Sequence, residues 1–166
     1  MKKIVFVIIL ILNCSYLMYG QKDKPEFRTK IENINYLVKS IDSIGKQKNE
    51  GVVEGVVKYS HGPNKNYGWE AYFLNDENGE NPLRIRYNEN TRTGLEYLNL
   101  YYDQGQLIYS EFIKIEYNRK LKPIKKTVKK FNFENDNTLN PEDILDKDSV
   151  YILEKGKQLV KEIYKI

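Results

Sequence analysis

The sequence predicts an α+β domain with an N-terminal helix, an antiparallel meander of five or six strands, and a C-terminal helix packed on one sheet face. Apolar residues near both ends of the chain recur every three or four positions, which is the period of a helix. Between these segments apolar and polar residues alternate, which is the period of a strand. Short segments rich in Gly, Asn and Asp separate the alternating runs, as hairpin turns require. Helices at both ends of a run of hairpins favour a two-layer domain.

The N-terminus has the pattern of an export signal. Two lysines precede the nine-residue apolar run Ile4–Leu12, which is too short to span a bilayer as a helix. Gly20 is a small residue directly before Gln21. We expect cleavage between these two residues, so that residues 1–20 are removed and residues 21–166 form a single domain in the periplasm or the medium.

Lipidation of the same segment is the alternative. Cys14 ends a lipobox-like stretch, and a lipid at Cys14 would anchor the protein in the outer membrane. Asn13 stands where a lipobox has a small residue, so we expect soluble export and no other contact with a membrane. Cys14 is the only cysteine, so the mature chain has no disulfide, thiolate metal ligand or cysteine nucleophile. Cleavage also lowers the net charge from +4 to +2, which is too small to steer a partner.

Residues 22–46 have the pattern of one amphipathic helix. Pro25 suits its first turn and Gly45 suits its end. The opposite face carries charges of both signs, so we expect the helix to pack across a sheet rather than lie on a membrane. Its apolar stripe consists of Phe27, Ile31, Ile34, Leu37, Val38, Ile41 and Ile44.

Six alternating runs predict strands, and the segments between them predict turns. We expect one face of this meander to carry the helices and the other to face solvent. Phe112 beside Ile113 breaks the alternation and predicts a bulge. The strands are Gly51–Tyr59, Trp69–Leu74, Leu83–Tyr87, Leu95–Tyr102, Leu107–Tyr117 and Lys126–Phe133. The turns are Ser60–Gly68, Asn75–Pro82 with its Asn78-Gly79 pair, Asn88–Gly94 and the three-residue loop Asp103-Gln104-Gly105.

The C-terminal helix is expected to begin at about Ser149, after the polar segment Glu134–Asp143. Asp148 or Ser149 would be its cap. Gly156 inside it lowers helix stability by about 1 kcal/mol relative to Ala. The expected apolar stripe is Val150, Leu153, Val160 and Ile163.

Two stretches of the chain share an aromatic strand followed by an Asn/Asp-Gly or similar tight turn. They are GWEAYFLNDENG at Gly68–Gly79 and EYLNLYYDQGQLIYSEF at Glu96–Phe112. Together with the signal that ends before Gln21, they resemble small exported proteins of Bacteroidota-type bacteria with YYDNGKL-like hairpins between two helices. The resemblance implies an α+β fold and export, and no activity. The hairpins are also similar to those of some toxin-immunity proteins and of secreted β-lactamase-inhibitor-like domains.

Catalytic and metal-binding motifs are weak in this sequence. His61 is the only histidine and lies in a loop, where neighbouring Ser60 does not make a nucleophile–base pair. Asp76, Asn78 and Glu80 alternate like the start of a calcium loop, but the glycine and glutamate that such a loop needs are missing. We therefore expect no cofactor and no metal.

The alternative enzyme hypothesis is an envelope hydrolase that works with two carboxylates on the sheet. Such a pair would need a separation of about 5–10 Å. Charged residues on an exposed sheet face are commoner, so we expect a protein without enzymatic activity. The candidate carboxylates are Glu54, Glu70, Glu96, Glu111 and Glu116.

Eight basic residues fall within the 17 positions from Lys114 to Lys130, opposed by Glu116 alone. They could bind an acidic glycan, a lipopolysaccharide headgroup or an acidic protein surface. Alternatively, their only role could be to keep an edge strand soluble, and we favour this interpretation. Nucleic acid is not expected as a partner of an exported protein. The basic residues are Lys114, Arg119, Lys120, Lys122, Lys125, Lys126, Lys129 and Lys130.

The 14 tyrosines of the chain suggest a binding face. Tyr97 and Tyr101 share one face of their strand, and Tyr72 and Tyr109 could extend it on neighbouring strands. The leading hypothesis is an exported binding module that recognises an envelope protein or glycan through an open, tyrosine-rich sheet face. An inhibitor or immunity-type protein is the further alternative. The candidate binding residues are Trp69, Tyr72, Tyr97, Tyr101, Tyr109, Lys125, Lys126, Lys129 and Lys130.

Overall fold

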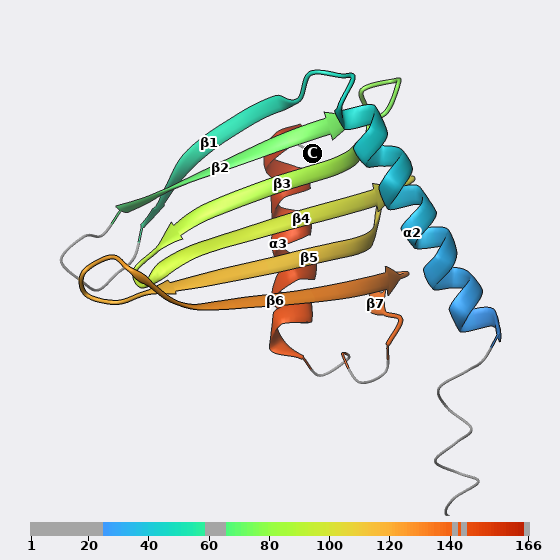
Figure 1. Ribbon diagram of the computed structural model, residues 1–166. Helices are drawn as coiled ribbons and strands as arrows, with labels where there is room; N and C mark the ends of the chain where they lie inside the picture. The colour runs from blue at the N-terminus through green and yellow to red at the C-terminus, as the bar shows by residue number, and fades with distance from the viewer. Residues whose placement is uncertain (1–24, 59–65, 141–142, 144–145, 165–166) are drawn as a thin grey trace, which may run out of the picture. The chain divides into compact units, whose positions relative to one another are not determined.

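Figure 1 shows the protein as a computed structural model, which describes residues 25–58, 66–140, 143 and 146–164. The chain divides into two compact units, residues 1–33 and 34–166. The elements in chain order are α2 (Pro25–Gly45), β1 (Gly51–Lys58), β2 (Asn66–Asn75), β3 (Pro82–Thr91), β4 (Gly94–Asp103), β5 (Gln106–Tyr117), β6 (Pro123–Glu134), β7 (Asn137–Thr138) and α3 (Lys147–Tyr164).

The predicted α+β class is confirmed, with one correction to the number of strands. The sheet has seven antiparallel strands in the order β1-β2-β3-β4-β5-β6-β7, so every strand pairs with its neighbour in the sequence. The additional strand, β7, lies in the segment expected to be a polar turn. Asn135 and Asp136 have φ angles of 51° and 61°, which these two residue types tolerate, and they turn the chain back onto the end of β6.

One face of the sheet packs on α3 and forms the main core. Ala71, Tyr87, Leu98 and Phe112 are register partners on four successive strands, so their side chains lie on the same face. All four are buried in a cluster with Ile152 and other residues of α3. Figure 1 shows α3 crossing this face, on the side of the sheet away from the viewer. The expected packing of the C-terminal helix on one sheet face is therefore confirmed.

The part of α2 in the second unit packs on the opposite face. Ile41 of α2 forms a second cluster with Leu74 and Tyr101, whose strand positions alternate with those of the main core. The expectation that one face carries both helices is therefore wrong. Each helix has a single apolar stripe, and the sheet offers an apolar area to each of them on a different face.

The first unit contributes the beginning of α2, which starts at Pro25; positions 22–24 of the expected helix lie outside the described residues. Two ion pairs one turn apart run along its surface, Arg28–Glu32 at 3.1 Å and Lys30–Glu26 at 3.6 Å. Such exposed pairs each stabilise a helix by about 0.2–0.5 kcal/mol.

Three expected loops differ from the observed ones. Asp103 pairs with Gln106, so the loop between β4 and β5 has two residues rather than three. Gln104 and Gly105 have φ angles of 49° and 79°, as a type I′ turn requires. The expected turn at positions 88–94 is largely strand, and only residues 92 and 93 connect β3 to β4. Positions 66–68, expected in a loop, begin β2, whereas 59–65 lie outside the described residues.

The bulge predicted at Phe112 is absent, and β5 has a bulge at another position. Residues 109 to 116 of β5 pair with β4 without interruption. The register shifts between Tyr101 and Tyr102, which pair with Tyr109 and Leu107, so Ile108 is the extra residue. Phe112 lies on the α3 face, in phase with the residues around it, and is 3% exposed.

Helix α3 begins two residues before the expected start. Its cap is Asp146, whose carboxylate accepts a hydrogen bond from the Asp148 N–H at 2.8 Å. Ser149, one of the two expected caps, is buried, and its hydroxyl donates to the Asp146 carbonyl at 2.8 Å. Ile152 and Leu159 form the centre of the buried stripe of α3, whereas Val150 is 48% exposed. The expected stripe therefore lay along one side of the observed one.

We predict that Gly94→Ala destabilises the protein and Gly68→Ala does not. A Cβ at position 94 would lie 1.8 Å from the Ile115 carbonyl oxygen, and such overpacking costs about 1–3 kcal/mol. A Cβ at position 68 meets no atom within 4 Å, and Ala removes the extra entropy cost of Gly in a strand. Urea unfolding of both variants checks this; equal stabilities would contradict it.

Candidate functional site

The candidate site is the part of the sheet face opposite α3 that α2 leaves uncovered, here called the open face. Two rows of register partners run across it, one on either side of the sheet centre. One row is Val52, Tyr72, Arg86, Asn99, Glu111 and Lys130, and the other is Glu54, Glu70, Asn88, Tyr97, Ile113 and Val128. Val56 and Gly68 continue the face on β1 and β2, and Lys126 continues it on β6.

The four predicted tyrosines do share the sheet face opposite α3, but two of them lie beneath α2. Tyr101 is 8% exposed, and its hydroxyl donates a hydrogen bond to the Asp42 carboxylate at 3.0 Å. Its ring centroid lies 5.6 Å from that of Tyr109, its register partner. Burial raises the pKa of both hydroxyls above their ordinary value. Tyr101 and Tyr109 therefore help to hold α2 on the sheet, and Tyr101 has almost no surface to offer a ligand.

Tyr72 and Tyr97 lie on the open face itself, and both are partly exposed. The Arg86 guanidinium lies over the Tyr72 ring, 5.4 Å from its centroid, which is cation–π geometry. A hydrogen bond with Glu70 raises the pKa of the Tyr72 hydroxyl. Tyr97 lies between Asn88 on β3 and Ile113 on β5. The sequence hypothesis of a continuous stripe of four tyrosines thus reduces to two separate tyrosines.

Large hydrophobic side chains are exposed along both margins of the open face. Val52 and Val56 on β1 are 58% and 57% exposed. Ile124 and Val128 on β6 are 63% and 46% exposed. Strand alternation places the three valines on the side away from α3, whereas Ile124 is the extra residue at a register shift between β5 and β6. Sequence analysis did not single them out, because an alternating strand pattern shows that one face is apolar without showing which face is covered.

A hollow lies between these margins, over the beginning of β2. It has a volume of about 590 Å³, and Gly68 forms part of its floor. The Asn88 amide donates to the Glu70 carboxylate at 2.8 Å beside Gly68, so the floor is polar. A glycine inside a strand commonly marks a place where another molecule approaches the backbone closely.

Trp69 lies on the opposite side of the sheet from the open face. It packs against the main core, with its ring centroid 5.8 Å from that of Tyr87. It lines a separate cavity of about 390 Å³ between the first two strands and α3. Trp69 therefore does not extend the surface formed by Tyr72 and Tyr97.

The predicted basic cluster is divided between the two faces and is partly neutralised. Lys129 faces α3, and its ammonium lies 2.8 Å from Asp146 and 2.6 Å from Asp148. These hydrogen bonds raise the pKa of Lys129 and tie β6 to the first turn of α3. Three other lysines have looser partners: Lys114–Glu96 at 3.3 Å, Lys130–Glu111 at 3.4 Å and Lys125–Glu116 at 3.9 Å.

The remaining four basic residues form no ion pair with the described part of the chain. Arg119, Lys120 and Lys122 lie in the exposed loop between β5 and β6, and Lys126 lies on the open face. The Asn118 carboxamide oxygen shapes this loop by accepting the N–H groups of Lys120 at 2.9 Å and Lys122 at 3.0 Å. Unpaired positive charge therefore concentrates at one corner of the open face.

A pair of carboxylates does face each other across two strands, but its second member was not predicted. Glu96 is the register partner of Glu89, on the α3 face. Lys155 lies 3.5 Å from Glu89, and Lys114 lies 3.3 Å from Glu96. The Tyr87 hydroxyl donates to Glu89, and the Tyr151 hydroxyl donates to Glu96 at 3.3 Å. Both carboxylates line a cavity of about 500 Å³.

Glu89 was missed because it lies in the segment expected to be a turn. Of the carboxylates that were predicted, Glu54 and Glu70 are register partners on the open face, together with Glu111 one row further along. Glu116 lies on the α3 side of β5, next to Lys125. Asp76 accepts the Glu80 N–H at 3.0 Å, and this bond and the Asn78-Gly79 pair form a hairpin turn, as predicted.

A buried arginine at the end of the sheet was also missed. Arg84 is 9% exposed and donates to Asp42 at 2.5 Å and to Glu50 at 2.9 Å. Arg86 donates to the other oxygen of Glu50. Burial alone would raise the pKa of Glu50, but the hydrogen bonds from the two arginines outweigh it and lower the pKa. Gly45 makes room for this group, because a Cβ there would lie 2.3 Å from a guanidinium nitrogen of Arg84.

Comparison with known proteins gives no further guide. No protein-family model matches the chain, and no curated protein or solved structure matches it. His61, Cys14 and the expected signal lie outside the described residues. Within the described ranges, neither helix has the length and apolar character needed to cross a membrane. The same ranges contain no group of three or more His, Cys, Asp or Glu side chains placed to hold a metal ion.

We predict that Glu50→Gln destabilises the protein at neutral pH and has little effect in acid. The folded pKa of Glu50 is lowered, so its contribution to stability is complete above the ordinary carboxyl pKa and is lost as the pH falls through the folded value. Urea unfolding at about pH 7 and about pH 3 measures the difference between variant and wild type at each pH. Glu77→Gln, at an exposed turn position, is the control. A difference that does not shrink in acid would contradict the prediction.

Proposed function

We propose that the protein is an exported binding module that recognises a protein partner through the open face. The observation that carries the proposal is the gathering of exposed hydrophobic side chains there. Among the described residues, seven large hydrophobic side chains are exposed, and three of them, Val52, Val56 and Val128, lie on this face. The valines of β1 and Val128 of β6 lie on opposite sides of the sheet with four strands between them, so a partner that contacts both spans the face. Exposed apolar surface of this kind marks interaction sites.

The chemistry of the face favours a protein over a glycan. The exposed groups along its margins are branched aliphatic side chains, which offer apolar area and no hydrogen bonds. The polar groups of its floor are largely engaged with each other, as Glu70 is with Asn88 and Arg86 is with Glu50. Apolar side chains mixed with satisfied polar groups are common at protein–protein interfaces, although the apolar groups there usually lie at the centre and the polar groups at the rim, the reverse of the arrangement here. A glycan ligand is an outcome that the experiment below distinguishes.

The expected partner carries acidic residues beside its apolar surface. Arg119, Lys120, Lys122 and Lys126 are exposed at the β6 corner of the open face and lack ion-pair partners among the described residues. Leu121, within the same loop, is 81% exposed. Positive charge next to apolar surface raises the association rate with an acidic partner and makes it sensitive to salt. An inhibitor or immunity-type protein would use the same face for one dedicated target.

We predict that Val56→Ser together with Val128→Ser abolishes partner binding while Val150→Ser leaves it intact. Val128 and Val150 are 46% and 48% exposed, so they are matched in exposure, but Val150 lies on α3, away from the open face. The proteins are immobilised and exposed to envelope extract, retained proteins are identified, and the affinity of the purified partner is measured. Losing two interface valines should weaken binding at least tenfold, or about 1.4 kcal/mol.

The possible outcomes of this capture experiment support the proposal, overturn it or replace the partner. A partner retained by wild type and Val150→Ser, lost from the double variant and eluted early by salt, supports the proposal. Retention of a glycan alone overturns it. Retention of the same protein by the wild type, the double variant and Val150→Ser also overturns it. A wild-type protein that captures only itself, and sediments as a dimer that the double variant does not form, replaces the external partner by a second copy.

The second candidate is the hydrolase that uses sheet carboxylates, and the opposed pair Glu89–Glu96 is the observation that favours it. Carboxyl groups about 5–10 Å apart support glycoside hydrolysis. Lys155 and Lys114 form ion pairs with these two carboxylates. Ion pairs of this kind also occur in networks whose role is purely structural.

We predict that the wild-type protein has no measurable hydrolase activity, so Glu96→Gln has none to remove. The measurement is release of reducing ends from envelope polysaccharide by wild type and by the variant. Activity in the wild type that falls at least a hundredfold in Glu96→Gln, in a protein that remains folded, would contradict the prediction and favour the hydrolase.

A further inference from the structure

The loop between β5 and β6 projects past the ends of these strands, at the left of the view in Figure 1. Leu121 in this loop is 81% exposed, the highest value among the large hydrophobic side chains that the structure describes. Ile124, at the base of the loop, is 63% exposed. Leu121 lies outside the strands, so the alternation of a strand does not account for its exposure.

The backbone of the loop holds Leu121 in an unfavourable conformation. Its φ angle is 57°, in the left-handed region that Gly and Asn adopt readily and that bulky side chains avoid. The Leu121 N–H donates to the Asn118 carbonyl at 2.9 Å, and the Asn118 N–H donates to the Lys122 carbonyl at 2.9 Å. Folding alone would favour Gly or Asn at position 121. Leucine there combines an unfavourable backbone conformation with an exposed apolar side chain, and packing within the protein explains neither.

Basic side chains lie on both sides of Leu121 and on the neighbouring turn. Arg119, Lys120 and Lys122 are exposed in the same loop. Arg92 is exposed in the turn between β3 and β4, at the same end of the antiparallel sheet. The Tyr117 N–H donates to the Thr93 carbonyl at 2.8 Å and ties the two connections together. These two connections therefore present four positive charges and no negative one around the exposed leucine.

The described turns at the opposite end of the strands carry negative charge. The antiparallel order places the β2–β3 and β4–β5 turns there. Neither turn contains a basic residue. Four acidic residues lie in these turns or next to them: Asp76, Glu77, Glu80 and Asp103.

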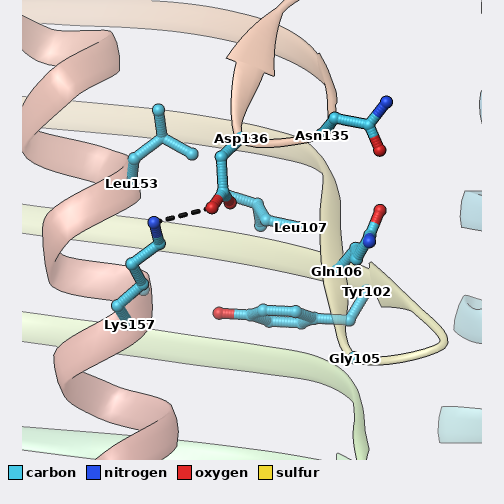
Figure 2. A pocket seen from close by; sticks show the side chains of 9 residues that line it. Tyr102, Gly105, Gln106, Leu107, Asn135, Asp136, Leu153 and Lys157 are labelled. Carbon is cyan, nitrogen blue, oxygen red and sulfur yellow. Dashed lines mark hydrogen bonds and ion pairs between the residues drawn. The ribbon is translucent and has the colours of Figure 1, made fainter.

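Two further groups at that end do not change the sign of its charge. Asp136, in the β6–β7 turn, is neutralised by Lys157 at 2.7 Å, and Figure 2 shows the two side chains pointing toward each other. Lys46 and Lys48 precede β1 at the same end and offset only two of the four acidic residues. A negatively charged surface would therefore attract the end of the sheet that carries Leu121.

We propose that the β5–β6 loop docks the protein on the surface of an anionic membrane. Leu121 would enter the boundary between headgroups and acyl chains, while Lys120 and Lys122 on either side of it contact lipid phosphates. A bilayer accepts a projecting leucine without a shaped pocket, and its charge extends over a plane that also reaches Arg92. An acidic protein would instead need a pocket for Leu121 with carboxylates around its rim.

This inference goes beyond the proposed function and leaves the open face free. The loop lies past the strand ends, whereas Val56, Val128 and Lys126 lie on the face itself. A protein docked through the loop would hold the open face beside the membrane, and the acidic residues of a protein partner would then meet Lys126. The inference departs from the sequence expectation that only a lipid at Cys14 brings the protein to a membrane, which rested on the mixed charge of the first helix.

The test is cosedimentation of purified residues 21–166, which lack the apolar signal, with lipid vesicles. One set contains phosphatidylcholine alone, and the other contains about 30% phosphatidylglycerol, in about 0.1 M salt. Leu121→Asn replaces the apolar side chain by a polar one of similar size that adopts the left-handed conformation readily. Val150→Ser is its control, because Val150 is exposed on α3.

A second pair of variants tests the charges. Arg119→Glu together with Lys122→Glu reverses two charges of the loop. Lys147→Glu together with Lys161→Glu changes the net charge of the protein by the same amount, at two exposed positions of α3. Only the reversal in the loop should abolish binding to the vesicles.

The wild type should bind the anionic vesicles and not the neutral ones, and about 0.5 M salt should release it, because salt screens exposed charges. Leu121→Asn should bind at least tenfold more weakly, or about 1.4 kcal/mol. It should also resist urea at least as well as the wild type, since its backbone conformation is less strained, so lost binding cannot reflect unfolding. Both α3 controls should bind like the wild type.

A wild type that binds neither set of vesicles overturns the proposal. Equal binding by the wild type and Leu121→Asn also overturns it, because adsorption through charge alone needs no leucine. If Leu121→Asn instead weakens capture of a protein from envelope extract while no vesicle is bound, the loop belongs to that protein's interface and the membrane proposal is wrong. The vesicles contain no protein, so Val56→Ser together with Val128→Ser should bind them like the wild type, and failure here is separate from failure of the proposed function.

Discussion

Arg84 holds the end of α2 against the sheet, and this contact determines how much of the second sheet face is left open. Its guanidinium is buried and reaches two carboxylates, one on α2 and one on the segment that follows it. Breaking a buried pair by removing one partner is strongly destabilising, by about 3–5 kcal/mol, because a charge is left without compensation. The apolar contacts of Ile41 with Leu74 and Tyr101 surround the same point. The helix is thereby confined to one end of the sheet, and the strands beyond it keep one face uncovered.

An antiparallel meander can leave a face uncovered because its hairpin connections, unlike βαβ crossovers, place no helix on either face. Here twelve buried residues, two of them on α3, form the main core on one face, and α2 covers only part of the other. The two edges are the remaining hazard. Lysines along β6 discourage pairing with another strand, and four charges near that edge have no partner within the described residues. The lysine cluster can therefore protect an edge and attract an acidic partner at the same time.

Local pattern was enough to predict the fold, because helices and hairpins depend on short-range signals. The strands, the Asn78-Gly79 turn and the course of α2 follow from alternation, glycine and proline. The errors occur where a contact distant in sequence decides the outcome. Asn88 to Thr91 looks like a turn by composition, yet pairing with β4 makes it strand and brings Glu89 opposite Glu96. Tyr101 looks like part of a binding stripe, yet its hydroxyl donates a hydrogen bond to Asp42, 59 positions earlier.

The glycines separate what packing requires from what it does not. At position 94 an added Cβ would lie 1.8 Å from a backbone oxygen, so the fold requires glycine there, and at positions 45, 51, 55 and 156 it would lie 2.3 to 3.1 Å from side-chain atoms that would have to move. Gly79 and Gly105 have φ angles of 76° and 79°, which side chains disfavour. Gly68 is different: its φ is not positive, and a Cβ would meet nothing within 4 Å. A strand glycine with open space around it leaves room for another molecule to approach the backbone, and Gly68 lies on the open face between the exposed valines of β1 and the polar floor formed by Glu70 and Asn88.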